Sequence, residues 1–291
     1  MPFGYKKYLV EKGKSIRTVD DYISLIEQFI AHLDYVYKKD PLEVFEIQNK
    51  HIRIFLDKKR YIDKIELSTL NKNITILKSF FNYLWKTQQI PVDPASKLEH
   101  AKYSINKPIS LRYEMLLEIL PSIITNNYYT ELKKIIFIFV MHGFRIQDFQ
   151  ILKKDVIDNG DSILIFPKYH EAIELYGQEL DIFIKVFNDA LFHESDYVFV
   201  TKRHDDKKLV PIEIMGIHKH LKEIQEDYRI PTKLNTNTIR HSYAYYLYHE
   251  KDFTFENIAT IFGIENSSAA LLVKESERRI EKGSETLEIN N

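Results

Sequence analysis

The chain has 291 residues, of which 44% are hydrophobic and 29% charged, and its formal net charge is −1. It contains no cysteine, which excludes disulfides and thiolate metal sites. No apolar run approaches the ~20 residues that a membrane span requires. The first residues also lack the apolar core of a secretory signal. We therefore expect a two-domain cytoplasmic protein without membrane association.

Basic and acidic residues are unevenly distributed along the chain. Residues 1–107 contain 19 Lys and Arg against 13 Asp and Glu, whereas the remaining residues contain 22 against 29. Nucleic-acid affinity depends on local neutralisation of phosphates, so a basic front third matters more than the total charge. This excess alone is a weak indication of nucleic-acid binding.

Residues 1–100 are predicted to form a small helical domain. Apolar residues recur at helical spacing, and Ser15 is placed to cap the first helix. The predicted helices cover residues 18–32, 44–56 and 68–85. Pro91 and Pro94 end this block, because proline removes an amide donor and disfavours helix in the residue before it. The segment 101–110 that follows is polar, basic and aperiodic, which is typical of an interdomain linker.

The rest of the chain is predicted to be a larger helical domain at 111–272 and a helical tail at 273–291. Alternating apolar residues predict a small antiparallel sheet from strands at 162–166, 172–175 and 197–200. Helical periodicity predicts helices at 112–124, 131–142, 178–191, 214–227, 237–249, 254–262 and 267–280. The polar end at 283–291 is expected to fray. The fold class is therefore mainly α.

Four segments carry a recognisable pattern. Two lie in the front domain: SIRTVDDY at 15–22, and STLNKNITILKSFFNYL at 68–84 with Asp-Pro-Ala shortly after it. Two lie in the larger domain: HGFRIQDF at 142–149 and TNTIRHSYA at 236–244. In this order, and with a strand-like segment between the last two, they resemble the tyrosine recombinase (phage integrase) family.

The resemblance implies an N-terminal helical core-binding (SAM-like) domain and a C-terminal integrase catalytic-type domain that hold a DNA duplex from opposite faces. Arg145 and Arg240 match the family's two phosphate-binding arginines, and Asp148 matches the acidic residue that supports the first. A guanidinium suits this task because it is planar, bidentate and permanently charged. The alternative for Arg145 is a simple salt bridge with Asp148. His241 also matches the second arginine box and is a candidate phosphate ligand.

Two more residues are candidate phosphate ligands. Lys168 stands in the predicted hairpin turn, where the family carries a lysine, although a solvated turn residue explains it equally well. Asn237 replaces the first histidine of the family's second arginine box, and asparagine donates to a phosphate but takes no proton at neutral pH. In the front domain, the candidates for DNA backbone contacts, whose alternative is ordinary solvated charge, are Lys14, Arg17, Lys72 and Lys78.

The reacting groups of the family are missing. Ile264 takes the place of the histidine in the family's Leu-Gly-His turn. Val273 stands nine residues later, where the family carries its nucleophilic tyrosine. Valine has no oxygen, so no phosphotyrosyl intermediate can form there. The last tyrosine of the chain, Tyr248, lies in the helix that carries Arg240. The resemblance therefore implies a degenerate active site, with no catalytic residue assigned.

Two local patterns have other interpretations. Residues 254–272 also fit a helix-turn-helix, which likewise indicates DNA binding. The chain has eleven histidines, but His218 and His220 are two apart on a predicted helix and point to different faces. We therefore expect no metal site and no cofactor.

The sequence predicts a sequence-specific double-stranded DNA-binding protein that does not cleave its target. We expect it to act as a regulator (repressor) or an accessory factor of a mobile element such as a prophage. The alternatives are an active recombinase with an atypical nucleophile, and a protein-interaction module that has lost DNA binding. The charged helical segment at 275–282 is a candidate contact for a homodimer or a higher oligomer.

Overall fold

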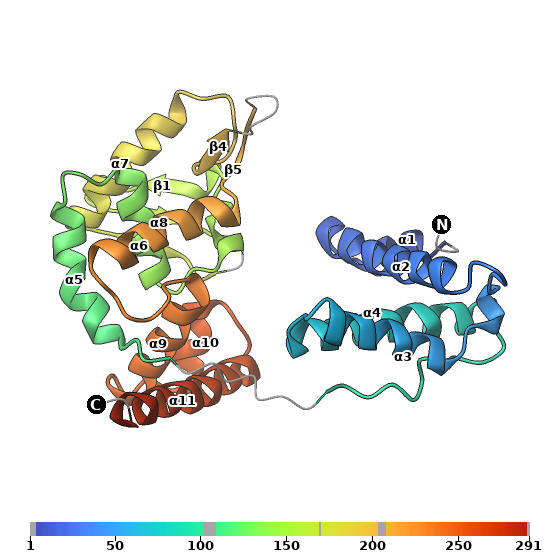
Figure 1. Cartoon of the computed structure of the whole chain (residues 1–291). Helices are drawn as coiled ribbons and strands as arrows, with labels where there is room; N and C mark the ends of the chain where they lie inside the picture. The colour runs from blue at the N-terminus through green and yellow to red at the C-terminus, as the bar shows by residue number, and fades with distance from the viewer. Residues whose placement is uncertain (1–3, 102–108, 169, 203–207, 290–291) are drawn as a thin grey trace. The chain divides into compact units, whose positions relative to one another are not determined.

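The computed structural model describes residues 4–101, 109–168, 170–202 and 208–289, with the backbone alone described for 281–289. The chain forms two compact units, Met1–Ile105 and Asn106–Asn291 (Figure 1). Helices dominate both units, and two small antiparallel sheets lie in the second. The prediction of a mainly α fold with a small antiparallel sheet is confirmed. Among the described residues, no helix is both long and apolar enough to span a membrane.

The described part of the N-terminal unit is a bundle of four α-helices. They are α1 (Tyr5–Glu11), α2 (Ile16–Val36), α3 (Asn49–Asp57) and α4 (Leu67–Lys86), with short η2 (Val44–Glu46) and η3 (Lys58–Ile62). Ser15 caps α2 as predicted, since its hydroxyl accepts the backbone N–H of Thr18 at 3.2 Å. Fully buried aromatic rings form the core, with Phe29 edge-on to both Phe55 and Phe81.

One predicted helix of this unit is wrong, and another helix was not predicted. The single helix predicted at 44–56 is divided, because the backbone is extended at Gln48 between η2 and α3. There the N–H of Gln48 donates to His51 Nδ1 at 3.1 Å, which starts a new helix. Helix α1 was not predicted, because its two buried residues, Tyr5 and Leu9, are too few to reveal a period.

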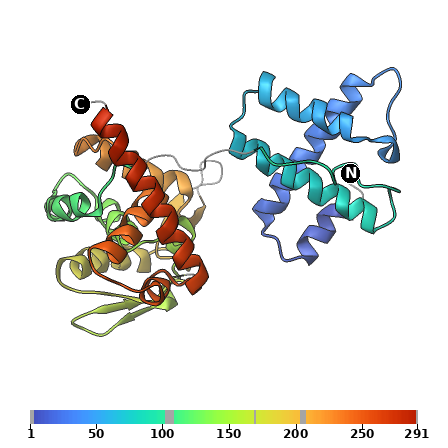
Figure 2. The same cartoon turned by 90° about the horizontal axis from the view of Figure 1, so that it is seen from below.

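The C-terminal unit contains seven α-helices among its described residues. They are α5 (Tyr113–Thr125), α6 (Glu131–Met141), α7 (Gly177–Leu191), α8 (Ile214–Asp227), α9 (Thr236–His249), α10 (Phe255–Phe262) and α11 (Asn266–Ile289). Helix α6 is the centre of this unit, since every residue from Ile135 to Val140 is fully buried. It packs against α7, α8 and α9, and α11 packs along α9 and α10 (Figure 2).

Two antiparallel sheets flank these helices. The three-stranded sheet has the order β1 (Val156–Asp158), β2 (Ile163–Ile165), β3 (Ile173–Leu175), and β4 (Val200–Lys202) pairs with β5 (Leu209–Pro211). Strands β2 and β3 therefore form a hairpin whose connecting turn contains Lys168. The strand predicted at 197–200 begins only at its last residue, and Tyr197 makes an isolated bridge to Leu152 instead.

The expectation of a frayed end is also wrong, because α11 continues without a break to Ile289. A helix can extend through a polar segment when its first turns are fixed by packing. Here Ala269, Val273 and Ile280 are buried on the side of α11 that faces the unit. The predicted boundary between domain and tail at residue 273 therefore falls within one continuous helix.

Candidate nucleic-acid interface

Arg145 lies in a tight turn directly after α6. Gly143 turns the chain with a φ of +88°, and Arg145 then precedes the short helix η4 (Ile146–Phe149). Asp148 accepts the backbone N–H of Arg145 at 2.7 Å and its side-chain Nε and Nη2 at 3.2 and 3.3 Å. The Asp148 side chain is fully buried, whereas that of Arg145 is 34% exposed. Asp148 thus fixes the direction of a guanidinium that still reaches solvent.

Arg240 approaches the same turn from α9, 95 positions further along the chain. Its Nη1 donates to the carbonyl oxygen of Gly143 at 2.7 Å, and its guanidinium carbon lies 4.2 Å from the ring centroid of Phe262. Burial, and after it the positive charge of Arg145, lower the pKa of Arg240 to about 10, while Asp148 opposes this. Arg240 therefore stays charged at neutral pH, and it is close enough to Arg145 for the two cations to repel.

Phe262 and Gly143 are packed so closely that no side chain fits between them. A Cβ atom placed on Gly143 would lie 2.2 Å from Cε1 of Phe262. The ring of Phe262 therefore supports both the turn that carries Arg145 and the guanidinium of Arg240. A cation over an aromatic face is stabilised by the ring quadrupole, and more strongly when it is desolvated, as here.

His170 joins this cluster from the β2–β3 turn and was not identified from the sequence. Its ring is buried, lies 4.6 Å from the ring of Phe144, and has Nε2 3.2 Å from the carbonyl oxygen of His142. Burial lowers the pKa of His170, and the charge of Arg240 acts in the same direction while Asp148 opposes it. No motif of the sequence marks this residue, because its role depends on the approach of two distant turns.

Lys168 and Asn237 are exposed beside this cluster. Lys168 precedes His170 by two residues in the β2–β3 turn. Asn237 lies in the first turn of α9, three residues before Arg240, so both residues are on the same side of the helix. The structure therefore places the candidate phosphate ligands Arg145, Arg240, Lys168 and Asn237 on segments that converge.

His241 is placed differently from the phosphate ligand that we expected. Its side chain is 3% exposed, and Nδ1 lies 2.8 Å from Oγ of Ser276 on α11. Burial, with Arg279 as the next cause, lowers its pKa to about 4. Since consecutive helical residues point in different directions, His241 joins α9 to α11 while Arg240 faces the turn. We therefore propose a structural role for His241.

Replacing His241 by Gln is expected to flatten the pH dependence of stability between about pH 4 and 6.5. The pKa of the His241 imidazole is about 4 in the folded chain and has the ordinary value of 6.5 in the unfolded chain. The unfolded state therefore binds the proton first as the pH falls. The free energy of unfolding then decreases across this window, by up to about 3 kcal/mol for this group. Urea unfolding at several pH values measures the slope, with the exposed His100→Gln as control. An unchanged slope in His241→Gln contradicts the assignment.

The position assigned to the nucleophile is part of a small core. Val273 is 1% exposed and belongs to a cluster with Phe262 and residues of α9 and α10. Ile264 packs against the same cluster. Tyr243 lies nearby, but its ring is stacked 4.6 Å from that of Tyr113, and burial raises its pKa, which disfavours the phenolate needed for attack.

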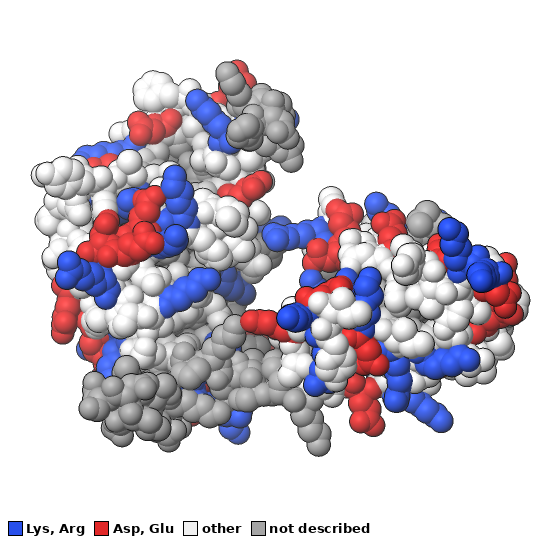
Figure 3. All heavy atoms as spheres, viewed as in Figure 1, with Lys and Arg blue, Asp and Glu red and all other residues white. Residues whose placement is uncertain are grey.

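The four candidate residues of the N-terminal unit differ in their surroundings. Lys72 is paired with Asp21 at 2.7 Å, and Nζ of Lys78 donates to the carbonyl oxygen of Leu98 at 3.1 Å. Lys14 and Arg17 are exposed at the start of α2. On the face seen in Figure 3, the basic side chains of this unit alternate with acidic ones. The uneven charge of the sequence therefore does not translate into a single basic patch on that face.

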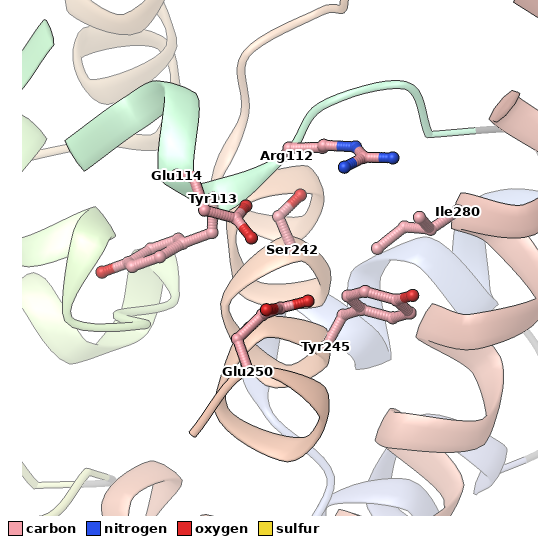
Figure 4. A pocket seen from close by; sticks show the side chains of 7 residues that line it. All are labelled: Arg112, Tyr113, Glu114, Ser242, Tyr245, Glu250 and Ile280. Carbon is pink, nitrogen blue, oxygen red and sulfur yellow. The ribbon is translucent and has the colours of Figure 1, made fainter. Parts of the chain in front are cut away.

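A cavity of about 300 Å³ in the C-terminal unit is separate from the arginine pair. Arg112, Glu114, Tyr245, Glu250 and other side chains line it (Figure 4). Tyr245 lies roughly 140° around α9 from Arg240, so the cavity and the arginine pair use different sides of that helix. With two carboxylates and one guanidinium, the cavity has no preference for an anion. Among the described residues there is also no group of His, Cys, Asp and Glu that would hold a metal ion.

The comparison with protein families matches residues 5–90 to the phage integrase N-terminal SAM-like domain. Among curated proteins, the chain is similar to the tyrosine recombinase XerC of Staphylococcus saprophyticus, with 23% identity over 250 residues that cover 83% of this chain and 80% of the relative. The XerC of Rickettsia massiliae is 24% identical over 259 residues, which cover 84% of this chain and 81% of the relative.

Solved structures with a similar fold span both units. A lambda integrase (75–356) dimer bound to a COC′ core site has a TM-score of 0.65 and 15% identity, and the match covers 96% of this chain and 94% of that one. The XerH site-specific recombinase bound to palindromic difH, a post-cleavage complex, has a TM-score of 0.66 and 16% identity, with 95% and 82% covered. At these identities the structural likeness concerns the fold.

Proposed function

We propose that this chain, which belongs to the tyrosine recombinase (phage integrase) family, binds a specific double-stranded DNA sequence without cutting it. The phosphate ligands of the proposal are Arg145 and Arg240, assisted by Lys168 and Asn237, with Asp148 as support. Lys14 and Arg17 are the proposed backbone contacts of the N-terminal unit. Lys72 and Lys78 can join them only by leaving their present partners.

The single observation that carries this proposal is the coupling of the two arginines. Arg240 donates to the carbonyl oxygen of Gly143, two residues before Arg145, at 2.7 Å. Burial is the main cause that lowers the pKa of Arg240, the positive charge of Arg145 adds to it, and Asp148 opposes both. Holding two cations together costs free energy in the free protein, and a bound anion removes that cost. A phosphate between two bidentate donors gains charge-assisted hydrogen bonds as well. The site therefore suits a DNA phosphate.

The absence of cleavage is proposed from Val273 and its surroundings. The valine side chain fills a buried position between α9, α10 and α11, and no hydroxyl takes its place there. Covalent cleavage of a phosphodiester by this family's chemistry needs a nucleophile, a base for its proton and an acid for the leaving oxygen. Asn237 and Ile264 at the other two positions supply neither a base nor an acid.

A nicked suicide duplex separates binding from cleavage. In such a substrate, a strand fragment diffuses away after cleavage and any covalent protein–DNA adduct persists. We expect a salt-dependent gel shift and no adduct on a denaturing gel, because the chain offers the phosphate ligands without the nucleophile. An adduct would identify an active recombinase with an atypical nucleophile. If no gel shift appears even at low salt, the chain has lost DNA binding.

We also propose that binding is sequence-specific and that the chain has a regulatory role. A protein that occupies a site and leaves it intact acts as a repressor or as an accessory factor, and a mobile element is the setting we propose. Repeated selection from a pool of random duplexes identifies the bound sequence. We also propose that copies associate on DNA through α11, and the number of shifted bands at increasing protein concentration measures this.

A further inference from the structure

His170 connects three segments that are far apart in the sequence. Its ring packs against Phe144, and Nε2 reaches the carbonyl oxygen of His142, so the β2–β3 turn is attached to the turn after α6. On the other side, a Cβ atom placed on Gly263, the residue that ends α10, would lie 3.0 Å from Cα of His170. The backbone of His170 therefore lies directly against the end of α10.

We propose that His170 is a positioning residue that fastens the β2–β3 turn beside Arg145 and Arg240, so that Lys168 acts as a third cation on the bound phosphate. The inference rests on the proposed phosphate binding. Lys168 is exposed and precedes His170 by two residues, so anchoring His170 limits how far the backbone of Lys168 can move from the arginine segment. A lysine at the end of a loosely held turn would lose more side-chain and backbone entropy on binding.

The hairpin itself is too small to hold this turn. Strands β2 and β3 have three residues each and pair over only those three positions, from Ile163↔Leu175 to Ile165↔Ile173. The connection, residues 166–172, is therefore one residue longer than the two strands together, and it extends beyond the last paired position of the sheet. His170 supplies packing for this connection, since it is the buried residue of the turn that contacts the arginine segment.

The charged groups that face His170 are Asp148 from η4 and Arg240 from α9. Its other polar neighbours are the carbonyl oxygens of His142 and of Glu171, the latter 2.9 Å from Nδ1. Burial lowers the pKa of His170, and a neutral ring, which has one N–H, donates to only one of these two carbonyl oxygens. The bond to His142 requires this proton on Nε2, and Gln is the substitution that keeps a donor near the same place.

The test measures how the affinity for a random-sequence duplex of about 30 base pairs, roughly three helical turns, depends on salt. Each phosphate contact contributes about 0.9 to the slope of log K against log salt concentration. We expect His170→Phe, which keeps a ring against Phe144 but has no donor, to lower the slope by about 0.9, as Lys168→Gln does. The slope of the double variant, His170→Phe with Lys168→Gln, should fall no further than that of either single variant. His170→Gln should keep the slope of the unchanged chain.

Hydrogen exchange of the free protein provides a second measurement that needs no DNA. In His170→Phe the amides of Lys168 and of residues 170–172 should exchange about tenfold faster than in the unchanged chain, which corresponds to the loss of one hydrogen bond. A slope that His170→Phe leaves unchanged, or that Lys168→Gln leaves unchanged, overturns the inference. If the unchanged chain binds no DNA, the proposed function fails, and the role of His170 toward Lys168 fails with it. Unchanged exchange overturns the anchoring of the turn in either case.

Discussion

Replacing either arginine of the pair by alanine is expected to weaken DNA binding by about ten- to a hundredfold, the equivalent of one charge-assisted contact. Arg145→Ala removes a half-exposed guanidinium that Asp148 aims toward solvent. Arg240→Ala removes the buried one. Gel shifts at fixed salt concentration measure the affinity of each variant. The two losses should not add, because both side chains hold the same phosphate.

The two variants need different controls, because only Arg240 is buried. Its loss leaves the carbonyl oxygen of Gly143 without its donor, so the melting temperature of Arg240→Ala must be measured beside its affinity. Arg145→Lys keeps the charge and loses the bidentate geometry, and should bind with intermediate affinity. Lys219→Ala removes an exposed cation from α8 and serves as the matched control. Equal affinity of Arg145→Ala, Lys219→Ala and the unchanged chain would rule out the phosphate pair.

Gly143→Ala is expected to destabilise the C-terminal unit by about 2–5 kcal/mol. A φ of +88° costs a non-glycine residue about 1–2 kcal/mol. The added methyl group would also lie 2.2 Å from Cε1 of Phe262, and such overpacking adds about 1–3 kcal/mol. Either the ring of Phe262 or the turn must move, so the arginine pair is disturbed as well. Urea unfolding and the gel shift should therefore both change.

Gly160→Ala is the matched control for this prediction. Gly160 has a φ of +87°, nearly that of Gly143, but a Cβ atom placed there meets nothing within 4 Å. We expect it to lose only the conformational part, about 1–2 kcal/mol, and to bind DNA normally. If both variants lose the same stability, the contact between Gly143 and Phe262 has no energetic weight.

The helices with clear periods were predictable because each local signal agreed with the packing. The cap at Ser15 and the apolar period after it placed α2, and Thr130 and Thr254 similarly cap α6 and α10. The failures are at places where tertiary contacts decide. Helix α1 is held by the hydroxyl of Tyr5, which donates to Ser79 of α4, and a contact over 74 positions has no local signal.

The candidate site was predictable in part for the same reason. Arg145, Asp148 and Arg240 lie within short motifs, and the structure brings the two arginines to the same turn; the phosphate that they are proposed to share stays a prediction. Phe262 and His170 contribute as much to the geometry, but each acts through a segment distant in the sequence, and neither has a residue type that stands out. His241 shows the reverse error, because a residue beside Arg240 in a motif need not point in the same direction on a helix.

The burial of Val273 makes a larger side chain at this position costly. A tyrosine there would add a ring to a fully occupied space between three helices, at a cost of about 1–3 kcal/mol from overpacking. Several neighbours would have to become smaller before the larger side chain was tolerated. Val273→Tyr alone is therefore expected to lower the free energy of unfolding of the C-terminal unit by this amount.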